Sequence, residues 1–273
     1  MHISQVKLII TDMDGTLLNS NHAVSNRFFE LYKELQRHNI IFVAASGRPY
    51  YSLIEKLAPI KDDIIFIAEN GGLAIEKDHI LLSTPINAKD LHTLTTLINT
   101  LEDTHPVYCS KNKAYVKSKS AALMGLLSEY YKNYVVIADE SEIKEDVYKI
   151  ALYHEENSEQ YIYPHVKHLE KKFKVKVSAN HWVDISENLA NKGHALQLLQ
   201  EKYGISSAET MAFGDYNNDI EMLEGSYFSY AMGNAHPNVK AIARFETITN
   251  DENGVECVLE QLLLAKRALV LKQ

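Results

Sequence analysis

Short apolar runs, each followed by a polar loop that contains glycine, are the feature that most constrains the fold of this chain. They occupy residues 6–11, 40–45 and 64–68, and helically spaced apolar residues lie between the first two. Runs of this length that end in turn residues predict buried strands, and their alternation with helices predicts parallel β-α-β units. Ligands bind outside the carboxyl ends of such strands, so we expect the three loops to share one crevice.

This alternation is interrupted in the middle of the chain. Residues 83–188 hold strand-like and helix-like segments in mixed order, and apolar residues at helical spacing from Ile162 to Phe173 predict a helix there. The alternation of strands and helices resumes from Lys192. We therefore predict an α/β fold with a Rossmann-like, doubly wound parallel-sheet core at residues 1–82 and 189–273, and an inserted α+β domain at residues 83–188.

Composition and charge exclude several classes of protein. The chain of 273 residues is 46% apolar, has a formal net charge of −8, and contains two distant cysteines, Cys109 and Cys257. Net acidity gives no general attraction to nucleic acid or anionic membranes, and two such cysteines form neither a disulfide framework nor a thiolate zinc site. The apolar run before Asp12 is too short for a signal peptide or a membrane span. We expect a cytoplasmic protein that binds neither nucleic acid nor membrane, as a monomer or weak homo-oligomer.

Four aspartates lie at or just after predicted strand ends, namely Asp12, Asp14, Asp215 and Asp219. A carboxylate that attacks a phosphate dianion meets a repulsion of about 4 kcal/mol per charge pair at about 4 Å and an effective dielectric of about 20. A cation must neutralise this repulsion, and Mg²⁺ accepts one or two carboxylates while keeping several waters. Two acids two residues apart can take different roles, so we predict that Asp12 attacks phosphorus and Asp14 donates a proton to the leaving oxygen.

Other polar residues of these loops are suited to holding phosphate. Gly15 permits a sharp turn and Thr16 adds a hydroxyl, while Ser46 and Gly47 offer a hydroxyl and an N–H at a helix start. Lys192 opens a predicted helix and presents an ammonium as a point charge. Each feature has an ordinary alternative: an Asx turn for the Asp-x-Asp segment, a helix cap for the serine, and a surface position for the lysine. The prediction therefore depends on their occurring together.

In this order, the segments resemble the haloacid dehalogenase-like hydrolases, specifically the Cof-type sugar-phosphatase branch (subfamily IIB), in which a large α/β cap lies between the second and third motifs. The resemblance spans nearly the whole chain, with residues 83–188 as the cap. The segments similar to family motifs are Asp12-Met13-Asp14-Gly15-Thr16-Leu17-Leu18, Ser46-Gly47-Arg48, Lys192-Gly193 and Gly214-Asp215-Tyr216-Asn217-Asn218-Asp219. Shorter similar segments are Glu69-Asn70-Gly71, Met232-Gly233-Asn234-Ala235 and Asn253-Gly254-Val255.

The resemblance implies a role for each residue of the site. Asp12 would form an aspartyl-phosphate, and Asp14 would protonate the leaving alcohol and then activate water. The implied ligands of Mg²⁺ are Asp12, the main-chain carbonyl of Asp14, and Asp215. The implied phosphate-binding groups are the N–H of Met13, Ser46, Gly47, Lys192 and Asn218. The implied supporting residues are Thr16, Arg48, Asn70 and Asp219.

We therefore expect a magnesium-dependent phosphoric monoester hydrolase that acts on small phosphorylated metabolites, with sugar phosphates as the expected class. Two alternatives stay open at this point. A phosphomutase would return the phosphoryl group to the sugar. A non-catalytic phosphate-binding regulatory protein would keep the fold without turnover, although both acids of the Asp-x-Asp pair are present. The cap is expected to select the substrate, which the sequence does not name.

Overall fold

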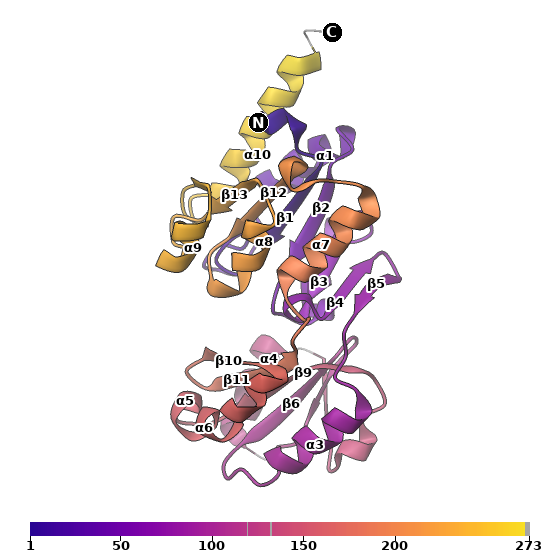
Figure 1. The fold of residues 1–273 in the computed structure, drawn as a ribbon, viewed down its shortest axis with the longest axis vertical. Coiled ribbons are helices and arrows are strands. Elements are labelled where there is room, and N and C mark those ends of the chain that lie inside the picture. The colour runs from indigo at the N-terminus through magenta and orange to yellow at the C-terminus, as the bar shows by residue number, and fades with distance from the viewer. Residues whose placement is uncertain (119, 132, 271–273) are drawn as a thin grey trace.

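The computed structural model describes residues 1–118, 120–131 and 133–270, and it contains two β-sheets formed by different parts of the chain (Figure 1). The larger sheet has eight strands in the order β14-β13-β12-β1-β2-β3-β4-β5. Its parallel strands are β1 (Leu8–Asp12), β2 (Ile41–Ala45), β3 (Ile65–Ala68), β12 (Thr210–Gly214), β13 (Phe228–Ala231) and β14 (Phe245–Glu246). The antiparallel strands at one edge are β4 (Leu73–Glu76) and β5 (His79–Ser83).

Helices cover the larger sheet. Every residue of β1 is buried, as a strand with both faces covered requires. The helices of this unit are α1 (Asn26–Arg37), α2 (Tyr50–Lys56), α7 (Lys192–Tyr203), α8 (Ile220–Glu224), α9 (Pro237–Ile242) and α10 (Gly254–Val270). In Figure 1, α7 lies beside α8, and α1 lies near α10. The predicted α/β fold with a doubly wound parallel sheet is thereby confirmed.

The smaller sheet lies below the larger one in Figure 1 and has six strands in the order β10-β11-β9-β6-β7-β8. These strands are β6 (His105–Ser110), β7 (Ala114–Val116), β8 (Tyr134–Val136), β9 (Val147–Tyr153), β10 (Phe173–Ala179) and β11 (Trp182–Glu187). The helices around it are α3 (Ala88–Ile98), α4 (Ala121–Tyr130), α5 (Ser158–Tyr161) and α6 (Tyr163–Val166). Among the described residues, no helix combines the length and the apolar character needed to cross a membrane.

The single helix predicted from Ile162 to Phe173 is wrong. Short helix α6 ends at Val166, a 3₁₀ turn follows at Lys167–Lys171, and Phe173 begins β10. Ile162, Val166 and Phe173 are nevertheless buried in one cluster and Leu169 packs against it, so the pattern identified the buried side of the segment. The type of element differs because Phe173 pairs antiparallel with Glu187 of β11, a distant contact that overrides local spacing.

Candidate active site

Asp12 is the last residue of β1, and its carboxylate is buried beside Lys192, the first residue of α7. The side chain of Asn191 accepts a hydrogen bond from the N–H of His194 at 2.6 Å and so caps the helix at this point. The Lys192 side chain is fully buried, and its ammonium contacts Asp12 and lies 2.7 Å from Oδ1 of Asp219. The start of α7 therefore places a cation directly against the carboxylate that ends β1.

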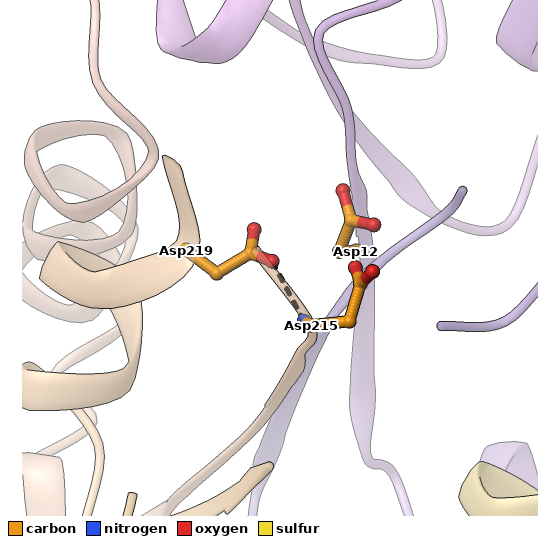
Figure 2. Close-up of side chains that lie close together, drawn as sticks. All are labelled: Asp12, Asp215 and Asp219. Carbon is orange, nitrogen blue, oxygen red and sulfur yellow. Dashed lines mark hydrogen bonds between the residues drawn. The ribbon is translucent and has the colours of Figure 1, made fainter. Parts of the chain in front are cut away.

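Three carboxylates gather around this point (Figure 2). Oxygen atoms of Asp12, Asp215 and Asp219 all lie within 4.8 Å of one another. Asp215 directly follows β12, and its Oδ1 accepts a hydrogen bond from the hydroxyl of Thr16 at 3.1 Å. Oδ2 of Asp219 accepts a hydrogen bond from the N–H of Asp215 at 2.9 Å, which is the dashed line in Figure 2. Asp219 thus holds the loop in shape, whereas Asp12 and Asp215 face each other.

Burial and mutual repulsion oppose ionisation of these carboxyl groups. Burial raises the pKa of Asp215 to about 6, and the charge of Asp219 adds to this effect. Burial also raises the pKa of Asp12 well above its usual value, although the charge of Lys192 acts in the opposite direction. For Lys192, burial lowers the pKa, but Asp12 and Asp219 together raise it above its ordinary value, so the ammonium stays charged. One ammonium does not balance three carboxylates, and the cluster therefore favours a further cation.

The oxygen atoms available here fit a hard divalent cation. Carboxylate and carbonyl oxygens are the ligands that Mg²⁺ and Ca²⁺ prefer. Within the part of the chain that the structure describes, these aspartates form the one group of three acidic, histidine or cysteine side chains close enough to share an ion. The side chain of Asp14 lies outside this group, and the predicted contact of its main-chain carbonyl with a metal stays a prediction.

Asp14 is instead held by Arg48, which follows β2. Nε and Nη2 of the Arg48 guanidinium each donate a hydrogen bond of 2.7 Å to the Asp14 carboxylate. Nδ1 of His22 lies 3.5 Å from the same carboxylate, and the Asp14 side chain is 37% exposed. A bidentate pair of this kind fixes the plane of a carboxylate. Asp14 is therefore oriented at an exposed position beside the buried cluster.

Loops that follow β2, β3 and β12 meet around Gly47. The N–H of Arg48 donates a hydrogen bond of 3.0 Å to Oγ of Ser46 and so closes the turn after β2. Asn70 lies against this turn, because a Cβ at Gly47 would come within 3.0 Å of the Asn70 Oδ1 atom. The same Oδ1 accepts a hydrogen bond from Nδ2 of Asn218 at 3.0 Å. The crevice predicted from the strand ends is thus formed by these three loops and by the loop after β1.

Comparison with known proteins identifies the family to which these motifs belong. Residues 9–259 match the family model described as haloacid dehalogenase-like hydrolase. The chain belongs to this family. The hydrolase is also 32% identical to YbjI of Escherichia coli strain K12, named 5-amino-6-(5-phospho-D-ribitylamino)uracil phosphatase, over 94% of this chain and 96% of the relative. The predicted family and the predicted enzyme class, a phosphatase, are confirmed.

Solved structures agree with this family membership. A protein from Streptococcus mutans UA159 is 33% identical, has a TM-score of 0.85, and is matched over 95% of this chain and 99% of its own. BT4131, described as a sugar phosphatase of subclass IIB in this superfamily, has a TM-score of 0.80 at 19% identity and is matched over 94% of this chain and 98% of its own. At that identity the likeness concerns the fold alone, and this hydrolase shares the fold of BT4131.

The residues predicted for the site of this hydrolase lie together around one cavity. The predicted residues that line it are Asp12, Asp14, Ser46, Gly47, Arg48, Asn70, Asp215 and Asn218. Lys192 and Asp219 are buried behind Asp12, and Thr16 is bonded to Asp215. The Met13 side chain is buried in the core, so its main chain is the part that can face a ligand. Their individual roles stay predictions.

The cavity extends to the smaller sheet and has a volume of about 670 Å³. Its charged lining residues from that sheet are Lys149, Lys174, Lys176 and Asp184. The sequence-based site did not include them. For Lys174 and Lys176 the sequence does hold a signal: polar and apolar residues alternate in β10, where these two lysines are two positions apart and share a face. That alternation identifies a polar face of the strand, but it does not say that this face meets the loops that follow β1, β2, β3 and β12.

Gly15 is required by both its conformation and its surroundings, which leads to a testable prediction. Its φ of 78° is left-handed, and a Cβ there would collide with the Asp215 carboxylate. We expect Gly15→Ala to lose about 1–2 kcal/mol of folding free energy through strain and, by displacing Asp215, to lower kcat/KM about tenfold or more. Thermal unfolding and steady-state kinetics measure the two effects.

Gly204 provides a matched control for this substitution. It also has a left-handed φ, 62°, but apart from its neighbours in the chain no atom lies within 4 Å of the position that its Cβ would occupy. Gly204→Ala should therefore carry the backbone strain without the collision, and its kcat/KM should equal that of the wild type. Equal losses of activity in the two variants would contradict the role given to Gly15.

Proposed function

We propose that this hydrolase cleaves monophosphate esters of small metabolites through two in-line phosphoryl transfers, with Asp12 as the nucleophile and Mg²⁺ as the cofactor. The observation that carries the proposal is the cluster of Asp12, Lys192, Asp215 and Asp219 at the floor of a cavity of about 670 Å³. A carboxylate held at a strand end, beside a lysine and a site for a divalent cation, can approach a phosphate dianion without prohibitive repulsion.

In the first transfer, a carboxylate oxygen of Asp12 forms a bond to phosphorus as the ester P–O bond breaks. Lys192 contacts Oδ1 of Asp12 and so sets the orientation of the attacking group. Asp14 donates a proton to the leaving alkoxide, which departs as an alcohol. The two hydrogen bonds from Arg48 keep Asp14 at the wall of the cavity that is proposed to hold the leaving group.

In the second transfer, water attacks the phosphorus of the aspartyl-phosphate while Asp14 accepts a proton from that water. The bond between Asp12 and phosphorus breaks, inorganic phosphate leaves, and Asp14 is protonated for the next turnover. The non-reacting phosphoryl oxygens are held by Ser46, Gly47 and Asn218, together with the Met13 N–H. The contacts among the loops that follow β2, β3 and β12 support this arrangement, because they fix these donors relative to one another.

Asp12, Asp215 and the main-chain carbonyl of Asp14 are the proposed ligands of Mg²⁺, with Asp219 fixing Asp215 through its main-chain N–H. When bound, the metal would supply positive charge to the phosphoryl oxygens beside the carboxylates. The donor set of closely spaced carboxylates supports this assignment. Among hard divalent cations, Mg²⁺ suits a site with few carboxylates because it keeps several of its waters.

Residues 83–188 are proposed as the cap that selects the leaving group. The cavity volume lies within the range of about 300–1,000 Å³ for small-molecule sites. On the cap side its polar lining includes Lys174, Lys176, Ser178 and Ser186. Such side chains suit a leaving group rich in hydroxyls, which supports sugar phosphates as the substrate class.

A panel of phosphorylated compounds tests the proposal. It contains hexose 1- and 6-phosphates, pentose 5-phosphates, the ribitylaminouracil phosphate in the name of the E. coli relative, nucleoside monophosphates and a phosphopeptide. With Mg²⁺ present, we expect release of inorganic phosphate, with kcat/KM for the best sugar phosphate about 100-fold above that for the phosphopeptide. Isomerised hexose phosphate without phosphate release would establish a phosphomutase instead, and a preference for the phosphopeptide would refute the substrate class.

A further inference from the structure

Lys149 of β9 extends from the smaller unit into the catalytic unit. Lys149 as a whole is 5% exposed. Nζ of Lys149 lies 2.8 Å from Oε2 of Glu69 and donates a hydrogen bond of 3.0 Å to the carbonyl oxygen of Gly47. A third oxygen, Oδ2 of Asp184 in β11, lies 3.8 Å from the same Nζ. A buried ammonium of the cap thus contacts two of the loops that form the phosphate-binding crevice.

The contact at Gly47 bears directly on the turn that follows β2. The carbonyl oxygen of Gly47 belongs to the peptide unit whose N–H is that of Arg48. That N–H donates to Oγ of Ser46 at 3.0 Å, while Lys149 binds the oxygen at the other side of the unit. Both polar atoms of this peptide unit are therefore fixed. Its orientation sets the positions of Ser46, Gly47 and the guanidinium that holds Asp14.

The contact at Glu69 holds a loop in an unfavourable conformation. Glu69, Asn70 and Gly71 have φ values of 50°, 56° and 101°, all left-handed, and Glu69 is 2% exposed. Left-handed backbone in residues other than glycine persists only where surrounding contacts impose it. Part of that constraint comes from the turn itself, since the N–H of Asn70 donates to the carbonyl of Ser46 at 2.9 Å. The ion pair with Lys149 is a constraint that comes from the cap.

This left-handed loop touches the remaining parts of the site. The Asn70 side chain accepts a hydrogen bond from Asn218 at 3.0 Å and lies against Gly47. A Cβ on Gly71 would collide with the main chain of Asn191, the residue just before Lys192. A displacement of the loop would therefore reach three groups that are proposed to hold phosphate.

We propose that Lys149 is a positioning residue for phosphoryl transfer, which fixes the turn 46–48 and the loop 69–71 from the cap while binding no substrate itself. The inference rests on the proposed function, because it takes those loops to hold the phosphoryl group. Lys149 acts through other residues because its ammonium is occupied by Glu69 and the Gly47 carbonyl. It follows that the phosphate-binding turn is complete only when the cap lies on the core, whatever leaving group the substrate carries.

Two variants separate positioning from stability. Lys149→Met leaves Glu69 as a buried charge without its lysine partner, so a loss of activity could follow from poor folding alone. Glu69→Gln combined with Lys149→Met removes the charges of Glu69 and Lys149 with little change in volume and leaves the carboxyl group of Asp184 in place. The double variant should recover part of the lost thermal midpoint, because Asp184 still lacks the ammonium that lay 3.8 Å from it. It also still lacks the hydrogen bond to the Gly47 carbonyl. Lys172→Gln is the matched control, because Lys172 forms an ion pair with Asp90 inside the smaller unit.

The readouts are the thermal midpoint, and kcat and KM for para-nitrophenyl phosphate and a hexose 6-phosphate with Mg²⁺. For Lys149→Met we expect kcat to fall by about ten- to a hundredfold, by a similar factor for both substrates, with a smaller change in KM. In the double variant, kcat should stay low while the midpoint partly recovers. Lys172→Gln should match the wild type in both kinetic constants.

Three outcomes would overturn the inference. In the first, kcat of Lys149→Met stays within about twofold of the wild-type value. In the second, kcat of the double variant recovers together with its thermal midpoint, and in the third, Lys149→Met changes only KM for the hexose phosphate. The last outcome would make Lys149 a leaving-group contact. Failure of the proposed function is seen separately, because it would appear as full activity in Asp12→Asn, a variant that leaves Lys149 and its contacts unchanged.

Discussion

Asp12→Asn lowers the turnover of every phosphoester substrate by a factor on the order of 10⁴ or more, because the substitution removes the nucleophilic oxyanion with almost no change in volume. The amide keeps the shape of the side chain beside Lys192, which remains paired with Asp219 at 2.7 Å. The measurement is phosphate release at saturating substrate and Mg²⁺, compared with the wild type. Release at the wild-type rate would remove Asp12 from the mechanism.

The stability of the same variant gives a second readout. Burial raises the pKa of Asp12, which means that its ionised form is disfavoured in the folded protein. Removing that charge should therefore leave the thermal midpoint of the metal-free protein unchanged or raise it. Such a gain is expected where a residue needed for activity lowers the stability of the folded state. Asp90→Asn is a suitable control, since Asp90 is a buried, ion-paired aspartate of the smaller unit. It should keep full activity, and a large loss there would point to a general effect of removing a carboxylate.

Removal of Mg²⁺ is the second change with a large expected effect. In excess chelator, we expect activity to fall to the background and to return when Mg²⁺ is added back, because Asp12 and Asp215 otherwise repel the phosphate dianion. Added Mg²⁺ should also raise the thermal midpoint, since a ligand at 100 times its Kd contributes about 2.7 kcal/mol to the stability of the folded state. Activity that persists in the chelator would exclude the metal from the mechanism.

Substitution of a single proposed ligand makes the metal test specific. Asp215→Asn should raise the Mg²⁺ concentration needed for half-maximal activity by about ten- to a hundredfold and reduce the stabilisation by Mg²⁺. Glu209→Gln is the control, because Glu209 lies at the surface and pairs with Lys7 at 2.7 Å. Its Mg²⁺ dependence should equal that of the wild type. The same shift in both variants would indicate an effect of net charge alone.

The meeting of the loops that follow β1, β2, β3 and β12 could be predicted from the sequence because their placement follows from a local rule. Asp12 ends β1, and Asp215 directly follows β12. Parallel strands in register bring such positions together, and β1 pairs with both β2 and β12. Knowing that each polar loop follows a buried strand is then enough to predict that their side chains meet.

The contacts made by the smaller sheet could not be predicted in this way. Lys149 and Gly47 are 102 positions apart and belong to different sheets, so no strand pairing places one beside the other. The same limit explains the error at Phe173, where pairing with β11 gave a strand in place of a helical turn. Arg48 was predicted as a supporting residue, but its bidentate pairing with Asp14 depends on side-chain directions that spacing does not fix.

The covalent intermediate on Asp12 is the central claim, and the Asp14→Asn variant offers the most direct test. With para-nitrophenyl phosphate the leaving group needs little protonation, so the first transfer can proceed while the second lacks its proton acceptor. The variant is mixed with this substrate and Mg²⁺, quenched in acid within the first turnover, digested and analysed by mass spectrometry. We predict that the mass of one phosphoryl group accumulates on the peptide that carries Asp12. Release of phosphate without any covalent enzyme, or a phosphoryl group on another residue, would contradict the account.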